Sequence, residues 1–294
     1  MTDAVPPELA VARERFLELV VALRPELHRY CARLVGSAIE GEDVLQDTLA
    51  KAFYALSTER ELPPLRPWLF RVAHNTAVDS LRRYERRHVE PRGDFETTAA
   101  VDEIDPIANR MALSAFSALP IQQRSAVILK DVLGHSLEEL SKTMGCSLAA
   151  AKSTLLRGRA ALQRSAEQDA EAVALRPDAE ERKRLERYVA LFNAREWDGL
   201  RSILSEECRL DLVGRHRARG KQTHEYYSHY AQAPAVRLCV ANVEGHWGLA
   251  ATTADERPDY FILLSWEQDR VVEIRDFRYA AYVAQEANIT AAEG

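Results

Sequence analysis

Residues 136–159 read SLEELSKTMGCSLAAAKSTLLRGR, and this stretch decides the fold of the middle of the chain. It predicts two short helices joined by a tight turn. Ser136 is suited to cap the first helix, because Glu139 stands three residues later, where a capping box requires it. Gly145 falls where a left-handed residue ends a helix at little cost. Ser147 can then cap the second helix.

The second helix of this hairpin is basic on one side and apolar on the other. Helical spacing directs Ala151, Leu155 and Leu162 inward and the polar side chains outward. The chain has no acid between Glu139 and Glu167, whereas this interval contains Lys142, Lys152, Arg157, Arg159 and Arg164. A helix-turn-helix that lays a cationic helix in the DNA major groove needs this arrangement. An ordinary helical hairpin with a solvated basic face is the alternative.

A second amphipathic helix is predicted over residues 41–56, GEDVLQDTLAKAFYAL. Its apolar stripe consists of Val44, Leu45, Leu49, Ala52, Phe53 and Leu56. Asp43, Gln46 and Asp47 fall on another side of the helix. The start of this helix is therefore expected to carry an acidic, exposed surface.

A third helix is predicted from Leu65, with Pro67 in the first turn, where a helix tolerates proline. Its apolar stripe consists of Leu69, Val72, Ala73, Ala77, Leu81 and Tyr84. The opposite side carries Arg71, Asn75, Asp79, Arg82 and Arg86. Basic and amide side chains on one face suit contact with nucleic acid, although a plain solvated face fits each helix taken separately.

Three segments in order, GEDVLQDTLAKAF, PWLFRVAHNTAVDSLRR and LEELSKTMGCSLAAAKSTLLRGRAAL, resemble the small bacterial sigma factors of the extracytoplasmic-function group. The first two resemble region two of that family and the last resembles region four. The resemblance covers about residues 15 to 165. It implies a non-enzymatic factor that binds core RNA polymerase, recognises promoter DNA and helps to open the duplex.

The resemblance also implies roles for individual residues. The helix with Asp43, Gln46 and Asp47 would contact the polymerase. The downstream promoter element would face Arg71, Asn75, Arg82 and Arg83. The upstream element would face Lys152, Ser153, Thr154 and Arg157.

Composition agrees with a globular protein of about two domains, since the 294 residues are 47% apolar and 29% charged. The net charge of −6 does not oppose DNA binding, because local basic clusters govern phosphate contact. Cys31, Cys146, Cys208 and Cys239 lack paired spacing, so neither a metal site nor a disulfide framework is expected. The sequence also suggests no cofactor, no membrane span and no signal peptide. A cytoplasmic protein is expected.

The remainder of the chain predicts a different fold class. Helices are expected over 180–193, 197–204 and 221–232, followed after Ala235 by strands that form an antiparallel curved sheet. The order of elements, and FNAREWDGLRSIL in particular, is similar to cone-shaped domains of the SnoaL and nuclear-transport-factor-two type. The whole chain is thus expected to have two all-α sigma domains followed by an α+β cone. The predicted segments are region two at 10–88, a linker at 89–108, region four at 109–166, a linker at 167–178 and the cone at 179–286.

Asp276 is the one candidate for chemistry in the cone. In an apolar pocket it could act as a base with a raised pKa. An ion pair between Asp276 and Arg278, or an Asp at the rim of the sheet, is the alternative. Tyr226, Tyr227 and Tyr230 are expected to be packing aromatics.

Two further functions stay open at this point. A stand-alone helix-turn-helix regulator would explain residues 136–164 but would leave the acidic and basic helices of residues 41–87 without a reason. A fused enzyme would place catalysis in the cone. The favoured hypothesis is a sigma factor whose C-terminal domain regulates it, through an intramolecular contact with the sigma domains.

Overall fold

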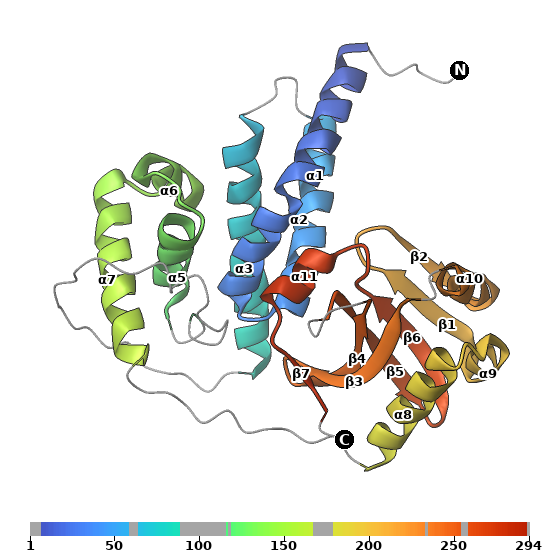
Figure 1. The fold of residues 1–294 in the computed structure, drawn as a ribbon. Coiled ribbons are helices and arrows are strands. Elements are labelled where there is room, and N and C mark those ends of the chain that lie inside the picture. Colours follow the sequence, from blue (N-terminus) through green and yellow to red (C-terminus); the bar gives the residue numbers. More distant parts are fainter. Residues whose placement is uncertain are drawn as a thin grey trace. The chain divides into compact units, whose positions relative to one another are not determined.

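The computed structural model describes residues 7–58, 64–88, 116, 119–166, 179–232, 235–253 and 258–292 (Figure 1). The chain divides into two compact units, Met1–Ala170 and Glu171–Gly294. The linkers predicted at 89–108 and 167–178 lie outside the described residues. So does most of the helix expected between Asn109 and Pro120.

The first unit is helical. Its elements are α1 (Pro7–Val35), α2 (Ala38–Thr58), α3 (Leu65–His88), α5 (Ile121–Val127), the π-helix η2 (Ile128–Val132), α6 (Leu137–Met144) and α7 (Leu148–Ala166). Helices α1 and α2 form an antiparallel pair, against which α3 packs. At their closest approach Gly41 lies on Ala32, and a Cβ at Gly41 would come within 2.5 Å of the Ala32 Cα. Glycine at this position therefore permits the tight crossing of α1 and α2.

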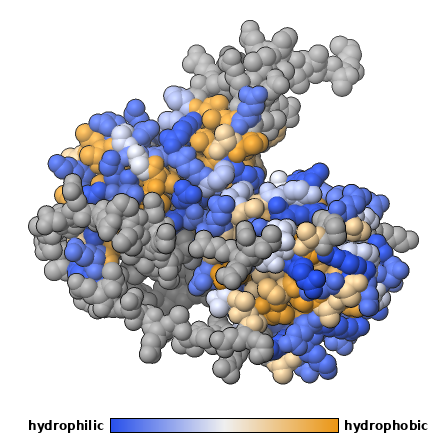
Figure 2. Space-filling model, viewed as in Figure 1, coloured by the Kyte–Doolittle hydropathy of each residue, from blue (hydrophilic) through white to orange (hydrophobic). Residues whose placement is uncertain are grey.

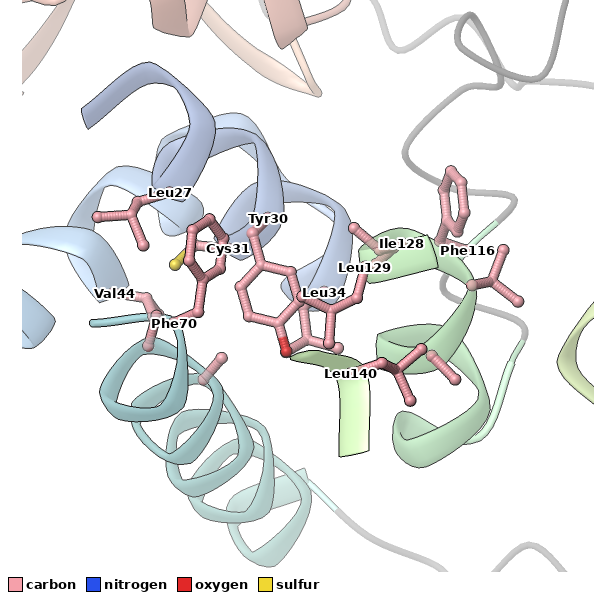
Figure 3. Close-up of a cluster of buried hydrophobic side chains, with 14 of the residues drawn as sticks. Leu27, Tyr30, Cys31, Leu34, Val44, Phe70, Phe116, Ile128, Leu129 and Leu140 are labelled. Atoms are coloured by element: carbon pink, nitrogen blue, oxygen red, sulfur yellow. The ribbon is translucent and has the colours of Figure 1, made fainter. Parts of the chain in front are cut away.

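One hydrophobic core runs through the whole helical unit. Tyr30 and Leu34 of α1 and Phe70 of α3 meet Leu129 of η2 and Leu140 of α6 in this core (Figure 3). All five side chains are fully buried or nearly so. The segments that resemble regions two and four thus share their core in this structure.

The predicted helix-turn-helix is confirmed in its local detail. The Ser136 hydroxyl accepts a hydrogen bond from the Glu139 N–H, and the Glu139 carboxylate accepts one from the Ser136 N–H, which completes the capping box. Gly145 ends α6 with φ of 65°. The Ser147 hydroxyl accepts a hydrogen bond from the Ala150 N–H at 3.2 Å, which caps α7.

The amphipathic pattern of α2 and α3 holds with two corrections. Phe53, assigned to the apolar stripe of α2, is 38% exposed. Helix α3 buries more than its predicted stripe, because Phe70, His74 and Thr76 are also buried. These additional residues are buried because α3 packs against both α2 and α6, which cover two of its sides.

The second unit is α+β, as expected. Its elements are α8 (Ala179–Asn193), α9 (Trp197–Ser202), β1 (Leu204–Leu212), β2 (His216–Arg219), the 3-10 helix η3 (Gly220–Glu225), α10 (Tyr226–Ala231), β3 (Arg237–Val243), β4 (His246–Thr252), β5 (Tyr260–Glu267), β6 (Arg270–Asp276), α11 (Ala281–Glu286) and β7 (Ile289–Ala291). The strands form one seven-stranded sheet in the order β2-β1-β6-β5-β4-β3-β7. Helix α8 packs against β3 and β4 (Figure 1).

The sheet differs from the expected one in two respects. Strands β1, β2 and β7 were not predicted, and β1 pairs with β6 in parallel, so the sheet is not wholly antiparallel. The alternation of apolar and polar residues over 208–212 (CRLDL) was a signal in the sequence that could have identified β1. The hairpin predicted at Gln268 and Asp269 is confirmed between β5 and β6, with φ of 53° at Gln268.

Candidate functional sites

The rotation of α7 about its axis is fixed by close packing on α5. A Cβ added at Gly158 would lie 2.7 Å from Val127 Cγ2 and 2.8 Å from the Gln123 carbonyl oxygen. Ala151 and Leu155 are buried on the same side. Because this side of α7 must face the core, the opposite side faces solvent.

The solvent side of α7 carries most of the residues predicted for the upstream element. Lys152, Ser153 and Arg157 are exposed, whereas Thr154 is half-buried. Arg159 forms a bidentate ion pair with Asp131 of η2, at 2.5 and 2.9 Å, and so serves the packing of α7. The outward cations closest to the start of the helix are therefore Lys152 and Arg157.

Two exposed apolar side chains on α7 had no place in the sequence prediction. Leu148 is 47% exposed and Leu156 is 45% exposed. The visible surface of the helical unit carries hydrophobic patches among hydrophilic ones (Figure 2). Helical periodicity could have placed Leu156 outward, because it directly follows the inward Leu155.

Helix α3 presents the residues predicted for the downstream element. Arg71, Asn75, Arg82 and Arg83 are all exposed. The Arg83 Nε donates to the Asp79 carbonyl oxygen at 3.2 Å, so its side chain lies along the helix. These four residues form a basic face over about three turns of α3.

Helix α2 presents the acidic surface. Asp43 and Asp47 are exposed, whereas Gln46 is half-buried and donates to the Glu42 carboxylate at 3.4 Å. Glu42 itself is fully buried and forms an ion pair with Arg24 of α1. Gln46 thus supports a buried ion pair in addition to any surface role.

The acidic surface borders a hollow of about 510 Å³ at the junction of α1, α2 and α3. Its lining brings Asp43 and Asp47 together with Arg83, which the sequence had assigned to a different surface. The other lining residues are Val35, Gly36, Ser37, Glu40, Val44, Ser80 and Leu81. The predicted polymerase surface and one end of the predicted downstream DNA surface therefore adjoin.

The helix-turn-helix also contacts the basic helix α3. A Cβ added at Gly145 would lie 3.6 Å from the Arg71 guanidinium, so Arg71 lies beside the turn between α6 and α7. Arg66 donates to Glu26 of α1 at 2.6 Å and lies 3.7 Å from the capping-box residue Glu139. These ion pairs join the start of α6 to α1 and α3.

The helical unit also contains a buried polar cluster, which the sequence did not predict. The Tyr30 hydroxyl lies 2.8 Å from both His74 Nδ1 and Ser125 Oγ, which are 3.1 Å from each other. Burial, with a contribution from Arg82, lowers the pKa of His74 to about 4, so the imidazole is neutral at physiological pH. Since buried polar groups require partners, this cluster stabilises one defined packing of α1, α3 and α5.

Asp276 in the second unit is fully buried at the end of β6. Its Oδ2 accepts hydrogen bonds from the hydroxyls of Tyr226 at 2.9 Å and Tyr230 at 2.8 Å, and its Oδ1 accepts one from the Arg278 N–H at 2.9 Å. The Arg278 Nε lies 3.7 Å from Oδ2. Tyr260 donates to the Tyr230 hydroxyl at 3.0 Å and extends the network. The ion pair considered from sequence is therefore present, and the tyrosines are hydrogen-bond donors as well as packing residues.

The ionisation of Asp276 is expected to make the stability of the second unit depend on pH. Burial raises the pKa of Asp276, against the opposing effect of Arg278. The folded unit therefore holds this proton more tightly than the unfolded chain does. The free energy of unfolding falls as the pH rises from the pKa of Asp276 in the unfolded chain to its higher pKa in the folded unit. Within that interval the loss is at most about 1.4 kcal/mol per pH unit.

The measurement is urea unfolding between pH 4 and pH 8, followed by tryptophan fluorescence. Asp276→Asn cannot ionise and should show a smaller fall in unfolding free energy than the wild type. Asp269→Asn, at an exposed turn, is the matched control and should keep the wild-type slope. Equal slopes for wild type and Asp276→Asn would contradict the raised pKa.

Two features are missing from the described residues, a helix suited to span a membrane and a cluster of metal ligands. None of the helices there is both long enough and apolar enough to cross a membrane. No group of three or more His, Cys, Asp or Glu residues in the same part of the chain is placed to hold a metal ion. The four cysteines are free thiols in the structure.

Comparison with known proteins gives two family matches in the helical unit. The family described as Sigma-70 region 2 matches residues 19–87, and that described as Sigma-70, region 4 matches residues 109–162. These ranges contain α2 and α3 in the first match and the helix-turn-helix in the second.

Individual proteins are similar to this chain over parts of its length. The ECF RNA polymerase sigma factor SigG of Mycobacterium tuberculosis is 28% identical over 212 residues, covering 63% of this chain and 57% of SigG. The chain thus spans little more than half the length of SigG. The RNA polymerase sigma factor CarQ of Myxococcus xanthus is 33% identical over 152 residues, covering 50% of this chain and 86% of CarQ. The crystal structure of the M. tuberculosis extracytoplasmic function sigma factor SigJ has 20% identity and a TM-score of 0.36, covering 88% of this chain and 95% of SigJ.

The two family matches occur in the order predicted from the sequence, and the identity to CarQ extends over most of that sigma factor. The residues of the acidic helix, the basic helix and the helix-turn-helix all fall inside the matched ranges. The chain therefore belongs to the extracytoplasmic-function group of RNA polymerase sigma factors.

Proposed function

We propose that this chain is an alternative sigma factor that binds core RNA polymerase and directs it to specific promoters. One observation carries the proposal: a single packed unit exposes an acidic helix, a basic helix and an acid-free helix-turn-helix. A stand-alone DNA-binding regulator would need only the last of these. The proposed work of this chain is binding and not catalysis, in keeping with its similarity to RNA polymerase sigma factors. We place this work in the cytoplasm, where the bacterial chromosome lies.

The proposed roles of individual residues are those that the family resemblance implies, and the charge and exposure of these residues support them. Asp43 and Asp47, with Gln46 beside them, are proposed to contact the polymerase. Arg71, Asn75, Arg82 and Arg83 are proposed to face the downstream element. The upstream element is proposed to face Lys152, Ser153, Thr154 and Arg157. Thr154 is half-buried, so it offers the DNA less surface than the other three.

Selection from a DNA library by the complex tests this function. Core polymerase, the chain, and the two together are each incubated with a library of bacterial promoter fragments, and retained DNA is sequenced. Only the mixture should enrich fragments that share two elements. Enrichment of the same fragments by the chain alone would instead identify a stand-alone regulator.

The second unit is proposed to regulate the sigma unit through an intramolecular contact. Only twelve residues, 167–178, separate α7 from α8, which holds the units at an effective concentration on the order of millimolar. Even a weak contact between the two units is then substantially populated. Polymerase can shift the balance between the contacting and the separated arrangement only if it binds one of them more tightly than the other. Catalysis is not proposed, because both carboxylate oxygens of Asp276 already accept hydrogen bonds from the protein.

Truncation after Asp178 is expected to change promoter-directed transcription severalfold, because it removes that contact while every proposed DNA-contact residue remains. The truncated chain keeps its own hydrophobic core and is expected to fold. Multi-round transcription with equal amounts of both proteins is the measurement. A rise identifies an inhibitory contact, and a fall identifies a contact that stabilises the polymerase complex. Identical transcription from the two proteins would refute regulation, and turnover by the second unit that is lost in Asp276→Asn would favour an enzyme.

A further inference from the structure

The outward face of α7 combines two large apolar side chains with its cations. Leu148 and Leu156 are 47% and 45% exposed, whereas Leu155 between them is 4% exposed and lies in the core. The packing of Gly158 on α5 fixes this orientation, so the two leucines cannot turn inward without separating the helices. Single exposed leucines are common on protein surfaces, but here both lie on the outward face of the predicted reading helix, where they offer apolar surface that a bound partner could cover.

The side chains available on this face restrict how a DNA sequence could be read. Residues 148–157 contain no Asn, Gln, Asp or Glu. Bidentate recognition of adenine requires Asn or Gln, and the amino group of cytosine is recognised by Asp or Glu. What remains is Lys152 or Arg157 for the guanine O6 and N7 atoms, the hydroxyls of Ser153 and the half-buried Thr154, and apolar contact with the thymine C5 methyl group.

The position of Leu148 suits contact with base edges, and Leu156 extends the same side of the helix. Leu148 is the first residue of α7, directly after the cap Ser147, and residues near the start of a recognition helix contact bases. Lys152 lies one turn further and Leu156 two turns further along the same side. Eight residues of helix rise about 12 Å, which is about the rise of three to four base pairs.

We infer that Leu148 and Leu156 are specificity-determining residues that contact thymine methyl groups in the upstream promoter element, with guanine read by Lys152 between them. This inference rests on the proposed function, because it assigns the readout of the same surface. The charge of the face selects DNA over a protein partner, since the chain has only cations and no acid between Glu139 and Glu167.

Replacement of thymine by deoxyuridine removes the methyl group and keeps every hydrogen-bonding atom. The upstream element is first obtained by selection with the complex of core polymerase and the full-length chain. Each thymine of the selected element is then replaced in turn by deoxyuridine, and the affinity of the complex for each duplex is measured. Loss of one buried methyl contact should weaken binding about fourfold.

The leucine variants complete a double-mutant cycle. Leu148→Ala and Leu156→Ala should each weaken binding to the thymine duplex and should each be insensitive to deoxyuridine at one position. Leu156→Met should keep the wild-type sensitivity, because it retains an apolar side chain of similar length. Val21→Ala, at a residue that is 75% exposed on α1, is the control and should change neither affinity.

The possible failures are distinguishable. Equal wild-type affinity for thymine and deoxyuridine duplexes at every position would overturn the methyl contact while leaving the sigma function intact. Leucine variants that weaken binding of the chain to core polymerase in the absence of DNA would show that the leucines contact protein, and would also overturn the inference. Failure of the complex to select any element would overturn the proposed function itself.

Discussion

Reversing the charges of Asp43 and Asp47 to lysine is expected to abolish stable binding to core polymerase. Both carboxylates are exposed on α2, at the rim of the hollow formed with α1 and α3. The proposed contact would pair these carboxylates with cations of the polymerase, so two reversals would place like charges against each other, which costs several kcal/mol. Binding should therefore weaken at least a hundredfold, as measured by co-elution and by titration of labelled chain with core polymerase.

The fold of this variant should be unchanged, because lysine favours helix at least as well as aspartate. The matched control reverses Glu206 and Asp269, two exposed acids of the second unit, and alters the net charge by the same amount. The control should bind core polymerase as the wild type does. Unchanged co-elution of the Asp43 and Asp47 variant, with the same melting temperature, would contradict the polymerase contact and favour a stand-alone regulator.

Changing Lys152 and Arg157 together to alanine is expected to weaken recognition of the upstream element by one to three orders of magnitude. Both side chains are exposed on α7, away from the side that Gly158 packs against α5. A lost contact to a base costs about 1–3 kcal/mol and relaxes sequence preference at that position, whereas a lost phosphate contact lowers the salt slope by about one. Titration of promoter DNA with the polymerase complex at several salt concentrations separates the two roles.

Lys183 and Arg187 provide the control for this double change. They are exposed cations four residues apart on α8 of the second unit, and their replacement by alanine removes the same charge. Promoter affinity should change little in this control. Wild-type transcription from the cognate promoter by the Lys152 and Arg157 variant would refute the assignment of α7 as the reading helix.

Local signals in the sequence predicted the helix-turn-helix down to single hydrogen bonds. Ser136, Glu139 and Gly145 define the ends of α6 because caps act within one turn of the helix, and the structure confirms each of them. The inward positions of Ala151 and Leu155 followed from helical periodicity for the same reason. Short-range rules suffice where the partners lie close together in sequence.

Long-range partners could not be predicted in this way. The cluster of Tyr30, His74 and Ser125 joins residues up to 95 positions apart, and none of the three carries a local signal for burial. The parallel pairing of β1 with β6 is equally remote, because it joins the start and the end of the second unit. Both features depend on the three-dimensional packing of the units.

For the candidate contact residues, the sequence predicted exposure but not which residues are neighbours. Asp43, Asp47, Arg71, Asn75, Lys152 and Arg157 are on the surface, as amphipathic patterns predicted. The patterns could not show that Arg83 borders the same hollow as Asp43, or that Arg71 lies beside Gly145, because helices from different parts of the chain create these neighbourhoods. Sequence thus predicted which side chains are available, and the structure shows which of them adjoin.

Transcription from purified components tests the central claim most directly. Core polymerase is supplied with a DNA fragment bearing the selected two-element sequence, with or without the full-length chain, and the 5′ ends of the transcripts are mapped. We predict that the chain produces transcripts that begin at one defined position downstream of the two elements. Removal of either element should abolish them. The same transcripts from core polymerase alone, or none in the presence of the chain, would contradict its action as a sigma factor.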